Sequence, residues 1–173
     1  MALAGSVMWL DEDICLLVER AQLIYGTDIM AESSSHPGEI VVTKNHRHEG
    51  HCLQWKHHHF FLLPSGQLYD PNLYMHMELV WLKNMHYDEG KYRSLILKCD
   101  LKNLVNCPVF AALLCAFYNH IFLDYTIVKD VLQPTHPVLE MREICLDPSC
   151  LELPILRKVI YVDGLPIMSE GPM

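Results

Sequence analysis

Apolar residues near the amino terminus recur three and four positions apart, which is the spacing of one face of an amphipathic helix. The recurring residues are Ile14, Leu17, Val18, Ala21 and Ile24. Asp11 is well placed to cap the start of such a helix, and Gly26 is well placed to end it. The pattern therefore predicts a helix from Val7 to Tyr25.

Short apolar runs bounded by turn residues follow, and these favour β-strands. Ile40 to Thr43 is β-branched throughout, and Cys52 to Trp55 fits the start of another strand. Phe60 to Leu63 is closed by Pro64-Ser65-Gly66, after which Gln67 to Tyr69 resumes an extended pattern. A strand, a tight turn and a strand in this order predict a hairpin.

The second half of the chain has one strong helix pattern and two further strand patterns. Arg93 to Cys99 alternates between polar and apolar residues, which favours a strand. Asn106 opens a strongly apolar segment that is typical of a buried helix. Val159 to Val162 precedes Asp163-Gly164, a pair that predicts a second hairpin. Met75 to Met85 fits a helix and a strand equally well.

Composition narrows the class of protein. The chain has 173 residues, of which 51% are apolar, so it can form one domain with a buried core. Its formal net charge of −8 argues against a broad basic surface for nucleic acid. The seven cysteines are irregularly spaced, and acidic residues interrupt the one early apolar stretch, so we expect no secretory signal. We therefore expect reduced thiols and a cytoplasmic location.

Candidate chemistry centres on Cys107, which lies at the expected amino-terminal end of the Asn106 helix. A helix amino terminus favours the thiolate, the reactive form of cysteine. Such a nucleophile needs a base, which the His57-His58-His59 run can supply, and the base needs an orienting group. Asp70, on the expected second strand of the hairpin, is the candidate for that role.

Three sequence blocks, taken in order, resemble the motifs of the lecithin:retinol acyltransferase superfamily. Residues 37–42 resemble its opening Pro-Gly-acid-aliphatic strand, residues 58–70 its H-box, and residues 106–111 its Asn-Cys block. Gly66 sets the register that puts the family's catalytic histidine on His58. The resemblance extends over about residues 37 to 115.

The resemblance implies an α+β fold in which a small antiparallel sheet packs on a helix that carries a cysteine at its amino terminus. This is a permuted NlpC-type, papain-like core. It also implies Cys107 as nucleophile, His58 as base and Asp70 at the position of the second family histidine, with no cofactor and no metal. We expect a single domain over residues 1–173. Its core spans about residues 37–125, with the helix 7–25 and the segment 133–173 as additions.

Several features depart from the cellular enzymes of this family. The interval between His58 and Cys107 is shorter, Asp70 replaces a histidine, and Pro108 replaces an acidic residue. We also expect no carboxy-terminal membrane anchor, because no apolar run is long enough to span a bilayer. These departures are similar to those of picornaviral 2A proteins of the H-box/NC type. The similarity implies a viral protein in the host cytoplasm that binds host or viral replication proteins near membranes, with doubtful catalysis.

Two other functions remain open at this point. The first is a thiol-dependent phospholipase or acyltransferase that uses Cys107, His58 and Asp70 on lipid acyl esters. The second is a zinc-stabilised interaction module, whose candidate ligands are His46, His48, His51 and Cys52. Less specific interpretations also apply: Cys107 as a core cysteine, the histidine run as the start of a strand, and Asp70 as a turn residue.

Overall fold

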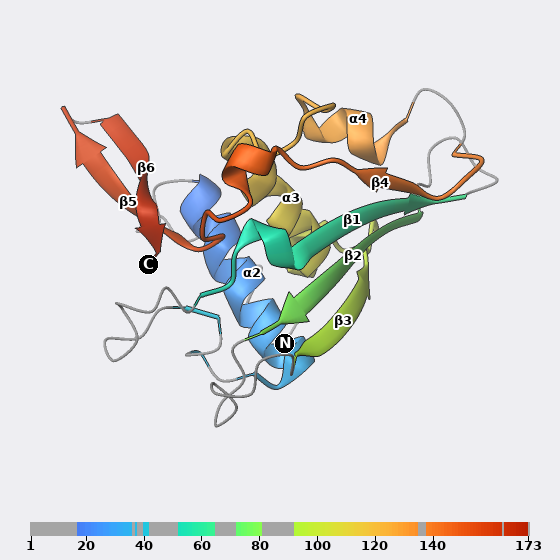
Figure 1. Ribbon diagram of the computed structural model, residues 1–173, viewed down its shortest axis with the longest axis horizontal. Helices are drawn as coiled ribbons and strands as arrows, with labels where there is room; N and C mark the ends of the chain where they lie inside the picture. Colours follow the sequence, from blue (N-terminus) through green and yellow to red (C-terminus); the bar gives the residue numbers. More distant parts are fainter. Residues whose placement is uncertain are drawn as a thin grey trace.

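The computed structural model describes residues 17–35, 37, 40–41, 52–64, 72–80, 92–134, 138–163 and 165–172 (Figure 1). The helices within these ranges are α2 (Leu17–Ser33), α3 (Pro108–Tyr118) and α4 (Val128–Leu132), with short 3₁₀ helices η3 (Trp55–His57), η4 (Leu104–Asn106) and η5 (Pro148–Cys150). The strands are β1 (His58–Leu63), β2 (Asn72–Leu79), β3 (Arg93–Lys98), β4 (Arg142–Ile144), β5 (Arg157–Val162) and β6 (Leu165–Pro172).

The described strands form a four-stranded antiparallel sheet, in the order β3-β2-β1-β4, and a separate hairpin of β5 and β6. Together with the helices this gives a mixed α/β architecture, which confirms the predicted class of helices with a small antiparallel sheet. Among the described residues, none of the helices has the length and apolar character needed to cross a membrane.

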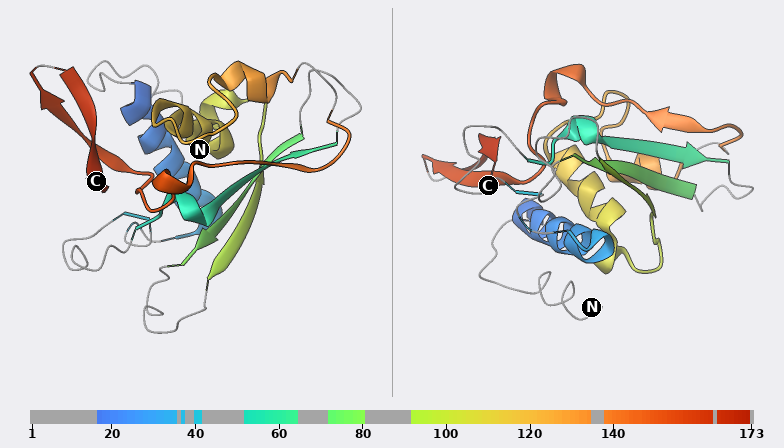
Figure 2. Two further views of the ribbon diagram at one scale, coloured as in Figure 1. Left: turned by 45° about the horizontal axis from the view of Figure 1, so that its top comes forward. Right: turned by 60° about the horizontal axis from the view of Figure 1, so that its bottom comes forward.

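One face of the sheet is buried because side chains alternate along β1 and β2. On that face lie His58, Phe60 and Leu62 of β1, together with Met75 and Met77 of β2. Helices α2 and α3 pack against each other, and their apolar residues join this face in one core. Figure 2 shows the two helices side by side on one side of the sheet.

Helix α2 differs from the sequence prediction at its carboxy-terminal end. It continues through Gly26 to Ser33, so the prediction that Gly26 ends the helix is wrong; residues 7–16 lie outside the described part. Gly26 serves close packing instead, because a Cβ atom there would lie 3.3 Å from Cδ1 of Leu156. The helix ends before Ser34, which has a φ of 54°.

Two predicted strands before the hairpin are wrong where the structure describes them. Ile40 and Val41 lie in a turn, where both of their N–H groups donate to the carbonyl of Pro37, at 3.1 and 3.0 Å. The segment predicted as Cys52 to Trp55 forms no strand, because the 3₁₀ helix η3 begins at Trp55. Gln54 makes only an isolated bridge to Pro154.

The first predicted hairpin is present as the antiparallel pair of β1 and β2, but the returning strand that the structure describes is Asn72–Leu79. β1 pairs with β2 in the register Leu63↔Asn72, so the returning strand begins at Asn72, and the ambiguous segment from Met75 is a strand as far as Leu79. The predicted strand Gln67 to Tyr69 lies outside the described residues. β3 and the β5-β6 hairpin are confirmed; in that hairpin Val162 pairs with Leu165, and Asp163 has the positive φ of 53° that such a turn requires.

Candidate functional site

Cys107 is held between the end of β3 and the start of α3. The N–H of Cys99 extends the β2-β3 pairing by donating to the carbonyl of Leu73, at 2.8 Å. A tight turn follows, in which the Asp100 carboxylate accepts from the N–H of Lys102 at 2.9 Å. Cys107 is then the N-cap residue of α3, and Pro108 occupies the first turn, where its missing N–H has no cost. The predicted placement of Cys107 at a helix amino terminus is confirmed.

The surroundings of the Cys107 sulfur stabilise a thiolate. Its pKa is lowered from the ordinary cysteine value, first by the hydrogen bond that it shares with the Cys99 thiol, whose sulfur lies 3.8 Å away, and against the opposing effect of burial. Backbone N–H groups at the start of α3 and of Asp100 act in the same direction; the N–H of Asp100 donates to the sulfur at 3.2 Å. Because these donors all point at Cys107, we assign the charge to Cys107 and the retained proton to Cys99, whose pKa is raised.

His58 lies in the core, with both ring nitrogens engaged. Its Nδ1 lies 3.2 Å from the carbonyl of Gln54, which can only accept, so Nδ1 carries the proton. Its Nε2 therefore accepts a hydrogen bond from the Tyr25 hydroxyl on α2. Burial lowers the pKa of His58 to about 3, although the Gln54 carbonyl acts in the opposite direction. The imidazole is consequently neutral at physiological pH.

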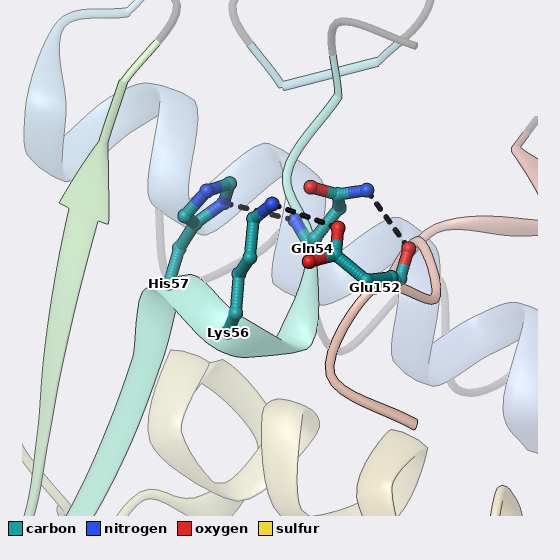
Figure 3. Close-up of polar contacts among 4 residues, drawn as sticks. All are labelled: Gln54, Lys56, His57 and Glu152. Atoms are coloured by element: carbon teal, nitrogen blue, oxygen red, sulfur yellow. Dashed lines mark hydrogen bonds and ion pairs between the residues drawn. The ribbon is translucent and has the colours of Figure 1, made fainter. Parts of the chain in front are cut away.

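Gln54, whose carbonyl His58 contacts, and the 3₁₀ helix η3 that follows it are held by polar contacts within the segment and with Glu152 (Figure 3). The Gln54 side chain donates to the carbonyl of Glu152 at 2.8 Å, and the Gln54 N–H donates to Nδ1 of His57 at 3.2 Å. Lys56 adds an ion pair with the Glu152 carboxylate at 2.7 Å. These contacts attach the start of β1 to the segment near η5, so the position of His58 depends on residues far away in the sequence.

The structure does not bring His58 and Cys107 together. Cys99, which contacts Cys107, lies opposite Leu73, and Leu73 pairs with Leu62 near one end of β1. His58 is the first residue of β1, four positions away from Leu62. At about 3.3 Å per residue, His58 lies about 13 Å along β1 from Leu62, and Cys107 lies near the Leu62 end. No hydrogen bond links His58 to Cys107, although the structure describes both.

The other predicted site residues give less information. Asp70 lies outside the described residues, as do His46, His48 and His51 of the predicted zinc loop. Within the described part of the chain, no group of three or more histidine, cysteine or acidic residues could hold a metal ion. The roles of Asp70 and of the zinc loop therefore stay predictions.

Three important residues were not found from the sequence: Tyr25, Gln54 and Cys99. Tyr25 and Gln54 carry no motif, and only the fold places them against His58. Cys99 had a usable signal, because it closes a predicted strand shortly before Cys107 in the sequence. A different buried thiol, that of Cys115, lies on the Tyr25 side of the core. Burial raises the pKa of Cys115 to about 12, so this thiol stays protonated.

A surface groove of about 710 Å³ lies between β4 and the segment that contains α4. Its lining reaches Leu62, in the core, and extends outward to Leu139 and Met141. These last two side chains are 82% and 66% exposed, and both line the groove, so exposed apolar surface gathers there. The groove is therefore a candidate binding surface that the sequence did not reveal.

No protein-family model matches the chain, and neither a curated protein nor a solved structure matches it. The functional argument therefore depends on the sequence motifs and on the geometry described above.

Proposed function

We propose that the chain is an H-box/NC protein of the picornaviral 2A type that supports replication by binding host or viral proteins, and that it does not catalyse acyl transfer. One observation carries this proposal. The candidate base is bound within the core by Tyr25 and Gln54, far from the candidate nucleophile. A general base must lie within hydrogen-bond reach of the proton that it removes.

The proposal includes the finer fold, a permuted NlpC-type core. Three features support it: a histidine at the start of a central antiparallel strand, a cysteine at the N-cap of a buried helix, and the order histidine before cysteine in the chain. On this proposal the family's framework is kept while the chemistry that it supports elsewhere is lost.

Labelling with a thiol-directed, lipid-like acyl probe tests the absence of catalysis. We expect slow labelling of Cys107, at the same rate in the wild type and in His58→Gln, because His58 does not contact the thiol. Intact mass and peptide mapping measure the rate and the site. Cys107→Ala is the matched control for probe specificity, and Cys115→Ala controls for the other thiol of α3.

An opposite result would support the alternative function, a thiol acyltransferase or phospholipase. One observation favours that alternative: Cys107 has the lowered pKa of a nucleophile. Rapid formation of an acyl-enzyme that His58→Gln slows by about a hundredfold or more would establish a working pair and overturn the binding proposal. In that case His58 must leave the core to reach Cys107.

The groove beside β4 is the proposed binding surface. Besides Leu139 and Met141 it presents the carboxylates of Asp124, Asp130 and Glu140. Arg142, which also lines the groove, lies over the ring of Tyr125 at 5.6 Å. This combination fits a partner segment that carries both apolar and basic side chains, and it is a poor match for an anionic lipid surface.

Charge reversal at the groove tests this assignment. A synthetic peptide of alternating leucine and lysine should bind the wild-type protein, and Asp130→Lys with Glu140→Lys should weaken binding at least about tenfold through lost charge complementarity. Glu32→Lys, at an exposed acidic position on α2, is the matched control and should leave the affinity unchanged. Isothermal titration measures the affinities. Equal weakening by Glu32→Lys, or preferential binding to anionic phospholipid vesicles, would contradict the groove assignment.

A further inference from the structure

Cys99 and Cys107 are arranged as a pair, and no function proposed above uses Cys99. Their sulfur atoms lie 3.8 Å apart, and both residues are buried in the core. Cys99 is fixed by its N–H bond to Leu73, and Cys107 by its place at the N-cap of α3. A disulfide requires the sulfur atoms to approach to about 2 Å, a shift that side-chain rotation of the two cysteines can supply.

We propose that Cys99 and Cys107 form a redox site, at which a hydroperoxide oxidises Cys107 and Cys99 then closes an intramolecular disulfide. The site does not depend on the proposed binding function, because it involves neither the groove beside β4 nor His58.

The two sulfur atoms have different roles in this reaction. Cys107 receives the N–H of Asp100 and lies at the amino terminus of α3, so it holds the negative charge and attacks first. Cys99 keeps its proton beside this thiolate and is the resolving thiol. This division matches the general pattern of redox-sensitive cysteines, in which an easily ionised thiol lies next to a second one.

The reaction balances as follows. The Cys107 thiolate attacks one oxygen of hydrogen peroxide, the O–O bond breaks, and a sulfenic acid forms while hydroxide leaves and takes up a proton. The Cys99 thiol then gives up its proton as its sulfur attacks the Cys107 sulfur. The S–S bond forms, the S–O bond breaks, and hydroxide leaves with that proton as water. Two electrons pass from the two sulfurs to the peroxide.

Access to the sulfur atoms is through the turn that separates the two cysteines. Cys107 itself is only 1% exposed, but the turn residues Asp100, Lys102 and Asn103 are exposed. The N–H of Asp100, an exposed residue, donates directly to the Cys107 sulfur, so the turn contacts the thiolate. Hydrogen peroxide is small enough to pass when this turn opens locally.

Peptide mapping after treatment of the reduced, full-length protein with hydrogen peroxide tests the proposal. We expect one dominant product, a disulfide between the peptides that carry Cys99 and Cys107. Cys99→Ser should stop at the sulfenic acid, which dimedone traps on Cys107. Cys107→Ser should lower the rate of thiol loss at least about tenfold, because this variant lacks the thiolate that attacks the peroxide first.

Two further measurements keep the result decisive if a serine variant fails to fold. In the wild type, alkylation of Cys107 by iodoacetamide should rise with pH around a midpoint below the ordinary cysteine pKa. Cys145→Ser, at an exposed thiol, is the matched control and should not change the yield of the Cys99–Cys107 disulfide. Oxidation concentrated on Cys145 and Cys150, with Cys99 and Cys107 left unlinked in the wild type, would overturn the proposal.

Discussion

Acidification from pH 7 to pH 4 is expected to destabilise this protein by about 3 kcal/mol through His58 alone. The folded state holds His58 as a neutral imidazole with a pKa of about 3, whereas the ordinary histidine value is 6.5. Between pH 6.5 and about pH 3, the unfolded chain binds a proton at His58 that the folded chain does not bind. The stability is therefore fully present above pH 6.5 and is lost as the pH falls toward 3.

The size of this effect follows from the surroundings of His58. Each pH unit within that window costs about 1.4 kcal/mol for one proton. Burial is the main cause of the lowered pKa. Among the described groups near the ring, Tyr25 stays protonated and so carries no negative charge, and His57, His59 and His76 oppose a further positive charge. His57, whose pKa burial lowers to about 4, acts in the same direction.

Urea unfolding of the wild type and of His58→Gln at pH 7, 5.5 and 4 measures the effect. Glutamine keeps an acceptor for the Tyr25 hydroxyl but cannot titrate. We expect the variant to be less stable at pH 7 and to lose about 3 kcal/mol less than the wild type on going to pH 4. His59→Gln, on the exposed face of the same strand and paired with Glu143 at 3.0 Å, is the matched control. The same acid loss in the wild type and in His58→Gln would show that His58 is not a buried neutral group.

Local patterns predicted the fold where each element's own residues determine it. β3, α3 and the β5-β6 hairpin are confirmed because alternation, a helix N-cap with a following proline, and an Asp-Gly turn act over a few neighbouring residues. The error at Gly26 has a tertiary cause, since the close approach of Leu156 explains the glycine, and a single sequence does not reveal that contact.

Only the local structure of the candidate site was predicted from the sequence. The position of Cys107 at a helix amino terminus followed from the sequence, but its neighbour Cys99 and the contacts of His58 depend on how distant segments pack. The separation of His58 from Cys107 follows from the way β1, β2 and β3 pair with one another. The residues of each strand, taken separately, do not determine that pairing. A motif therefore identified the residues of a possible active site without determining whether they meet.

Replacement of Phe60 by alanine is expected to lower the free energy of unfolding by about 3–5 kcal/mol, whereas the same replacement at Phe61 should cost about 1 kcal/mol or less. Phe60 is fully buried and packs edge-on against Phe122 with ring centroids 5.5 Å apart. Phe61 is next to it in the sequence but lies on the opposite, partly exposed face of β1. Denaturant unfolding followed by circular dichroism measures both variants.

This pair of variants also tests the register on which the site argument depends. Because successive side chains of a strand face opposite sides, a shift of one residue would bury Phe61 and His59 and would expose Phe60 and His58. The apolar run from Phe60 to Leu63 gives no sign of which face is buried, so the sequence allows both registers. A larger loss for Phe61→Ala than for Phe60→Ala would mean that His58 faces solvent, where it could act as a base. The expected order instead keeps His58 in the core, bonded to Tyr25, and leaves the Cys107 thiolate to react with a peroxide and then to form a disulfide with Cys99.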